Sequence, residues 1–213
     1  MSEERKKKAA RTAVSFLVMA VLLVILIFAS VNIGSLQVSP SELFRGLFIE
    51  RIENVAAIYD LRFPRIVISL FAGAAVAVSG VLFQAVLKNP LADPGIIGIS
   101  GGAGFAAVLV TAFFPALYFF TPLAAFGGGV LAFFLVYSLS WKGGLSPLRI
   151  ILTGVAVSAM FTGLTEALNS MTGGNSSGVA SIVEGNITQK TWEDVHTLLP
   201  YVVIGLILAV LSA

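Results

Sequence analysis

The sequence has 213 residues, of which 57% are hydrophobic and only 11% are charged, and its formal net charge is +2 at pH 7. Water-soluble domains carry about 25% charged residues, so this composition excludes a water-soluble globular protein and predicts an integral membrane protein. The chain has no cysteine, which excludes a disulfide framework and a thiolate metal site.

Six apolar stretches approach the roughly 20 residues that a helix needs to cross a bilayer. They predict an all-α polytopic helical bundle whose spans cover residues 12–31, 66–87, 96–114, 122–141, 148–168 and 196–213. No small-residue cleavage site follows the first stretch, so we expect a retained helix rather than a signal peptide. The last stretch reaches Ala213 without a polar flank, and we therefore expect the sequence to be truncated at its C-terminus.

Basic residues near the helix ends predict the orientation. The segment RKKKAAR at residues 5–11 places five Lys or Arg before the first span, and cytoplasmic segments are the ones enriched in basic residues. If the N-terminus is cytoplasmic and successive spans cross the membrane in alternating directions, eight basic residues lie on the cytoplasmic side and five on the outer side. We expect residues 1–11 to form a cytoplasmic basic tail and residues 1–213 to form a single transmembrane domain.

Two polar segments, residues 38–65 and 169–192, fall on the predicted outer side. The first holds four acids and four arginines, and its sequence Ser39-Pro40-Ser41-Glu42 predicts a helix start and a short surface helix. In the second, residues 177–185 are compatible with another surface helix, and Trp192 with an interface anchor.

The stretch QAVLKNPLADPGIIGISGGAG at residues 84–104 concentrates helix breakers between two predicted spans. Each proline predicts a turn, and the second also suits the first turn of the next helix. Irregular backbone at membrane depth is tolerated only inside protein or beside a wet cavity. We therefore expect a structural hinge near the cytoplasmic side, with its glycines against neighbouring helices, made by Asn89, Pro90, Asp93, Pro94, Gly98 and Gly102.

A hydrolase motif is an alternative interpretation of the same glycines. Gly98-Ile99-Ser100-Gly101-Gly102 fits G-x-S-x-G, but that motif needs a preceding strand and a triad histidine. The only histidine, His196, falls at the predicted outer face. An intramembrane hydrolase using Ser100 and a passive channel stay open as minor alternatives.

Three segments carry a resemblance to a known family. LRFPR at 61–65, the stretch 73–104 and ILTGVAVS at 151–158 closely resemble the FecCD-type permeases, the membrane subunits of type II ABC importers for ferric siderophores, haem and cobalamin. The resemblance covers essentially the whole chain and implies about six of ten spans, the N-terminal two-thirds of a permease. It implies import of an iron chelate, with a ferric siderophore ranked before haem and cobalamin.

The resemblance also implies partners. These are a second permease subunit, identical or different, two cytoplasmic ATPase subunits and an external binding protein or lipoprotein, all at a bacterial cytoplasmic membrane. ATP and Mg would be bound by the ATPases, so we expect no covalent chemistry, no cofactor and no metal in this chain.

Arg62 and Arg65 match the arginines before the second span of such permeases, and the resemblance implies that the binding protein docks there. Interfacial anchoring, or pairing with Asp60 or Glu53, is the alternative.

The predicted fifth span offers a candidate pathway. Its residues Gly154, Ser158, Thr162, Glu166 and Asn169 are spaced by four, four, four and three, so they share one helix face. Because the fifth span of the family borders the translocation path, the resemblance implies that Ser158, Thr162 and Glu166 line it. The alternative is a small-residue stripe for helix packing.

The connection before that span matches the inner gate of relatives, and the resemblance implies a cytoplasmic gate region at Ser146, Pro147 and Leu148.

Overall fold

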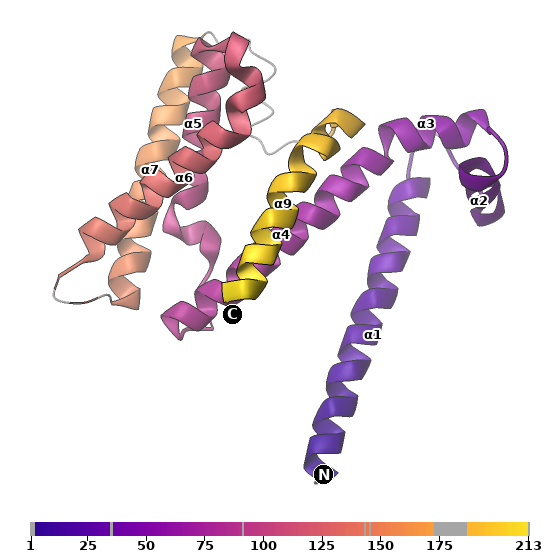
Figure 1. Ribbon diagram of the computed structural model, residues 1–213, viewed down its shortest axis with the longest axis horizontal. Coiled ribbons are helices and arrows are strands. Elements are labelled where there is room, and N and C mark those ends of the chain that lie inside the picture. Colours follow the sequence, from indigo (N-terminus) through magenta and orange to yellow (C-terminus); the bar gives the residue numbers. More distant parts are fainter. Residues whose placement is uncertain are drawn as a thin grey trace. The chain divides into compact units, whose positions relative to one another are not determined.

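A computed structural model describes residues 3–34, 36–90, 92–142, 144, 146–172 and 187–212, and all regular structure in these ranges is helical. The prediction of an all-α chain is therefore confirmed. The α-helices, in chain order, are α1 (Glu3–Asn32), α2 (Pro40–Phe48), α3 (Glu53–Leu61), α4 (Phe63–Leu87), α5 (Ile99–Phe113), α6 (Thr121–Ser140), α7 (Pro147–Met171) and α9 (Trp192–Ser212) (Figure 1). Two 3-10 helices, η1 (Pro94–Ile97) and η2 (Pro115–Phe120), precede α5 and α6.

Five helical segments of the described chain are long and apolar enough to cross a membrane. The third predicted span, 96–114, is wrong in extent, because α5 begins only at Ile99 and has 15 residues. Gly98 separates it from η1 with a left-handed backbone (φ 78°) that cannot continue an α-helix.

Contacts divide the chain into two compact units, residues 1–71 with 190–200 and residues 72–189 with 201–213. In the first unit, the last turn of α1 and helix α3 bury a small apolar cluster that contains Val31, Val38, Val55 and Ile58. Close approach of α2 to α3 depends on Gly46, where a Cβ would lie 2.6 Å from the Val55 side chain.

The helix start predicted at Ser39 is present in the structure. Ser39 is the N-cap of α2, its hydroxyl oxygen accepts from the backbone N–H of Glu42, and the Glu42 carboxylate accepts from the backbone N–H of Ser39 at 2.8 Å. This reciprocal pair is a capping box.

Trp192, expected as an interface anchor, lies against α3. Its indole N–H donates to the Tyr59 carbonyl at 3.2 Å, and the two rings are 4.8 Å apart. The surface helix considered at 177–185 lies outside the described residues.

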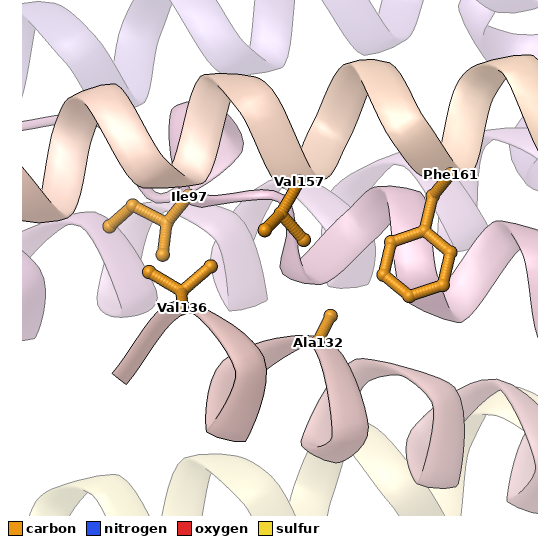
Figure 2. Packing of buried hydrophobic residues seen from close by; sticks show 5 residues of the cluster. All are labelled: Ile97, Ala132, Val136, Val157 and Phe161. Carbon is orange, nitrogen blue, oxygen red and sulfur yellow. The ribbon is translucent and has the colours of Figure 1, made fainter. Parts of the chain in front are cut away.

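In the second unit, α5, α6 and α7 pack side by side (Figure 1). Their shared core consists of Ile97 from η1, Ala132 and Val136 from α6, and Val157 and Phe161 from α7; the half-buried Ile99 and Phe105 of α5 pack against it. Figure 2 shows the side chains of Val157 and Phe161 projecting from one helix toward Ala132 and Val136 on another. The core fixes which side of α7 is turned inward.

Candidate functional site

The hinge stretch connects α4 to α5 by two turns. Helix α4 ends at Leu87, before Asn89-Pro90, and Pro94 begins η1. The Asp93 carboxylate accepts from the backbone N–H of Gly95 at 2.7 Å, which satisfies one of the donors freed at the start of η1. Gln84 spans the turn, because its side-chain amide donates to the Ala92 carbonyl at 3.4 Å.

Glycines hold this stretch against two helices. A Cβ at Gly98 would lie 2.9 Å from the Gly154 carbonyl oxygen on α7, and one at Gly102 would lie 2.6 Å from the Gly128 carbonyl oxygen on α6. Real Cβ atoms do not approach carbonyl oxygens this closely, so both positions need glycine for the backbones to meet. The structure thus brings the predicted hinge glycines into helix contacts.

Helix α7 presents two different sides. Val157 and Phe161 are buried in the shared core, whereas Thr162 and Glu166 are exposed. Ser158 is half-buried beside α5, where its Cα would lie 3.6 Å from a Cβ at Gly101.

The predicted polar face therefore divides along its length. Gly154 and Ser158 meet the beginning of α5, while Thr162 and Glu166 lie beyond that contact. Asn169, near the end of α7, is half-buried, and its Oδ1 has no hydrogen-bond partner among the described residues.

Thr162 and Glu166 line an open cavity of about 210 Å³ between α5 and α7. Its lining residues are Ser100, Gly101, Gly104, Val108, Thr162, Thr165 and Glu166. The α5 side was not predicted to line a pathway, because the helical spacing of α5 does not indicate which of its faces turns toward α7. The glycine-rich start of α5 was the available signal, since small residues leave space beside a neighbouring helix.

The cavity carries hydroxyl groups and one carboxylate. The Thr165 hydroxyl donates to the Phe161 carbonyl of its own helix at 2.8 Å. Within the described chain no basic group forms an ion pair with Glu166. The site can therefore offer hydrogen bonds and a negative charge to a ligand.

The surroundings of Ser100 do not resemble a hydrolase site. Ser100 lies at the start of α5, after η1 and Gly98, whereas the nucleophile elbow needs a strand before the serine.

Arg62 binds backbone carbonyl groups. Its Nη1 donates to the carbonyls of Val31, at the end of α1, and Leu36, the latter at 3.0 Å. The carbonyls at a helix C-terminus lack intrahelical partners and favour a cation. Neither arginine of the predicted pair forms an ion pair with Asp60 or Glu53 among the described residues. Arg65 is half-buried, and its Nε finds no described hydrogen-bond acceptor.

The predicted gate region forms the start of α7. Ser146 is the N-cap with extended backbone, Pro147 is the first helical residue, and Leu148 is 66% exposed. Arg149 donates to the carbonyls of Ser140 and Lys142, both at 3.2 Å, and so covers the end of α6. Arg149 is one of the eight basic residues predicted to lie inside, and its contact with the end of α6 was not predicted from the sequence.

In the part of the chain that the structure describes, no three His, Asp or Glu side chains gather in a way that could hold a metal ion.

Comparison with known proteins identifies the family. The FecCD transport family matches residues 22–213. The chain is 38% identical over 196 residues to the probable haem-iron transport system permease protein IsdF of Staphylococcus aureus, covering 92% of this chain and 59% of IsdF. It is 35% identical to the iron(3+)-hydroxamate import system permease protein FhuG of Bacillus subtilis, covering 100% of this chain and 65% of FhuG.

A solved structure agrees with these relatives. An inward-facing metal-chelate type ABC transporter matches with a TM-score of 0.61 at 26% identity, covering 87% of this chain and 56% of that one.

The chain spans roughly six-tenths of the length of the curated relatives, 59% of IsdF and 65% of FhuG. Its apolar helices and the family match make it an integral membrane protein. The chain belongs to the FecCD transport family.

Proposed function

We propose that this chain is a membrane-spanning permease subunit of an ATP-driven importer for an iron chelate, with a ferric siderophore as its substrate. The observation that carries the proposal is the family match over residues 22–213. The printed names of its relatives support an iron cargo, since FhuG is named for iron(3+)-hydroxamate import and IsdF for haem-iron transport.

The cavity between α5 and α7 supports a transport role over an enzymatic one. It offers Ser100, Thr162 and Glu166 to a ligand, and its described lining residues include no histidine that could complete a hydrolase triad with the serine. We place Ser158, Thr162 and Glu166 on the translocation pathway, with the region of Ser146, Pro147 and Leu148 at its cytoplasmic end.

The proposal includes the whole assembly. A second permease subunit, two cytoplasmic ATPase subunits and an external binding protein complete the importer, which lies in a bacterial cytoplasmic membrane with the N-terminus of this chain inside. ATP and Mg belong to the ATPases, and this chain performs no covalent chemistry.

Haem is the second candidate cargo, favoured by the similarity to IsdF. Cobalamin ranks third, because none of the named relatives described above is named for it.

Purification of the full-length protein with the products of its neighbouring genes tests the proposal. We expect an ATPase and a binding protein in the complex, and mass spectrometry of the loaded binding protein should find an iron chelate. Replacing Ser100 with Ala should leave chelate-stimulated ATPase activity nearly intact. Loss of all activity in that variant would favour the hydrolase, and a complex that moves iron without an ATPase would favour the channel.

A further inference from the structure

Among the described residues, a single ionisable group lines the cavity between α5 and α7. Glu166 is the only acid or base among its lining residues, and residues 150–165 of the same helix carry no charge. Ionisable residues in membrane helices are costly and are usually retained for function. The charge of Glu166 therefore calls for an explanation that helix packing does not give.

No neighbouring group neutralises this carboxylate within the described chain. In the same unit, Arg149 is engaged by the carbonyls of Ser140 and Lys142 at the opposite end of α7. The remaining walls are glycine backbone, Val108 and hydroxyl groups. A charge between apolar walls acts over a longer range than one in bulk water, since the walls screen it less.

The hydroxyl groups would not discriminate by charge. Ser100, Thr162 and Thr165 each hold an oxygen that accepts and a hydrogen that donates. Such groups suit the amide and hydroxyl periphery of a neutral chelate as well as that of a charged one. Glu166 is therefore the residue in this cavity that distinguishes ligands by charge.

We infer that Glu166 is a specificity-determining residue that makes this cavity selective for neutral or cationic iron chelates and unfavourable for polyanionic ones. The inference rests on the proposed importer function and narrows its substrate class. Hydroxamate chelates of ferric iron, which are neutral or cationic, fall in the favoured class, and triply negative tris-catecholate chelates fall in the disfavoured class.

The charge at the cavity can be measured without knowing the natural substrate. This sequence contributes no cysteine, so Thr162→Cys in the otherwise cysteine-free full-length complex gives one reactive thiol at the cavity. This thiol is labelled with two methanethiosulfonate reagents, a cationic trimethylammonium-ethyl one and an anionic sulfonatoethyl one. The labelling rate of each reagent is divided by the rate of the same reagent with a free thiol in solution, and the two ratios are compared. The measurements are made with and without ATP, so that both inward and outward states are sampled.

We expect the cationic reagent to be favoured about tenfold over the anionic one, the lower end of the range that focused fields produce in clefts. Glu166→Gln should remove that preference. Glu193→Gln, which neutralises an exposed acid in the first turn of α9, is the matched control and should retain it. An unchanged ratio in Glu166→Gln, or a thiol that neither reagent reaches in any state, would overturn the inference.

Uptake separates this inference from the proposed function. Proteoliposomes that hold the full importer are given a neutral ferric trihydroxamate or a triply negative ferric tris-catecholate, each loaded on a binding protein. Faster uptake of the trihydroxamate is expected, with the difference reduced in Glu166→Gln. Equal uptake of both chelates by the unmodified importer would contradict charge selection by Glu166 but leave the importer function intact. Uptake that does not depend on ATP, or no uptake of either chelate, would contradict the importer function itself.

Discussion

Gly102 and Gly128 lie where α5 meets α6, and their backbones are close enough to exclude a side chain at either position. A Cβ at Gly102 would lie 2.6 Å from both the Ala132 Cβ and the Gly128 carbonyl oxygen. In a membrane no hydrophobic effect drives helices together, so close van der Waals packing of small residues is a main source of association. The absence of a side chain at Gly102 and Gly128 therefore allows α5 and α6 to pack this closely.

Gly128→Ala should destabilise the packing of α5 on α6. The added methyl group would meet the Ala106 Cβ at 2.5 Å, and overpacking of this kind typically costs about 1–3 kcal/mol. The adjacent Gly127→Ala is the control, because a Cβ there meets nothing within 4 Å. Thermal unfolding of the full-length protein in detergent should show a lower midpoint for the first variant only; equal midpoints would contradict the packing.

Leucine at Gly98 or Gly102 should have a stronger effect and block assembly. At Gly98 the left-handed φ of 78° and the carbonyl of Gly154 both oppose a side chain. Ser100→Ala on the same helix should assemble normally. Size-exclusion chromatography of the complex checks this, and normal elution of the leucine variants would contradict the hinge.

Arg62 has a structural role in addition to the docking role implied by the family resemblance. Arg62→Ala removes its hydrogen bonds to the carbonyls of Val31 and Leu36, and hydrogen bonds of charged groups contribute about 1.5–3 kcal/mol. Arg45→Ala is the control, because the ion pair that Arg45 forms with Glu50 is exposed, and such pairs contribute little. Thermal unfolding should separate the two variants, and equal stability would contradict the contact.

Docking is best tested at Arg65, which forms no ion pair among the described residues. Arg65→Glu should weaken the affinity for the external binding protein at least tenfold, since desolvated interfacial charge pairs can contribute several kcal/mol, while expression and basal ATPase activity stay near normal. Adding Arg62→Glu should weaken binding further and also lower stability. Unchanged affinity in the double variant would contradict docking and favour the alternative, in which Arg62 and Arg65 anchor the helix at the membrane interface.

At the scale of elements, helix α2 depends on its first turn. Hydrogen bonds from the backbone N–H and the hydroxyl of Ser39 hold the pKa of Glu42 below its usual value of 4.5, and Arg45 lowers the pKa further. A lowered pKa in the folded state means that ionised Glu42 stabilises the helix above its unfolded pKa. That contribution is lost as the pH falls through the lowered value.

Ser39→Ala should therefore raise the pKa of Glu42 toward its usual value and loosen α2. Glu53→Gln is the control, because Glu53 begins α3, whose N-cap Ile52 makes no side-chain hydrogen bond. Hydrogen exchange of the α2 amides is followed between pH 3 and 6. In the native protein the amides should lose protection as the pH falls, whereas in Ser39→Ala they should be less protected at every pH. Protection that does not depend on pH would contradict the capping box.

The turns of the hinge could be predicted from the sequence because proline acts locally. Asn89-Pro90 ends α4 and Pro94 begins η1 whatever surrounds them. The start of α5 could not be predicted in the same way. The left-handed backbone of Gly98 accompanies the close approach of α7, and that contact joins residues distant in the sequence.

The same limit applies to the site. The polar face of α7 followed from a regular spacing, but the α5 wall of its cavity required the packing of two helices. The partners of Arg62 lie 26 and 31 residues away in the sequence, so local pattern suggested only neighbouring acids. Contacts of this kind are set by the tertiary fold rather than by periodicity.

At the scale of the whole molecule, the composition required a membrane and the family match supplies the biological context. Five helical segments of the described chain are able to span a bilayer, and the chain belongs to the FecCD transport family. Within that context, we propose that a hydrophilic cargo meets polar groups in the cavity between α5 and α7; Gly98 and Gly102 hold the start of α5 against α7 and α6.

The most direct measurement of the central claim is the uptake of iron-55 chelate by proteoliposomes that contain the full-length permease, its ATPase and its binding protein. The account predicts accumulation of the chelate that requires ATP hydrolysis and the binding protein and that stops when a non-hydrolysable ATP analogue replaces ATP. Iron entry that proceeds equally without ATP, or a complex that accumulates no iron chelate of any class, would contradict it.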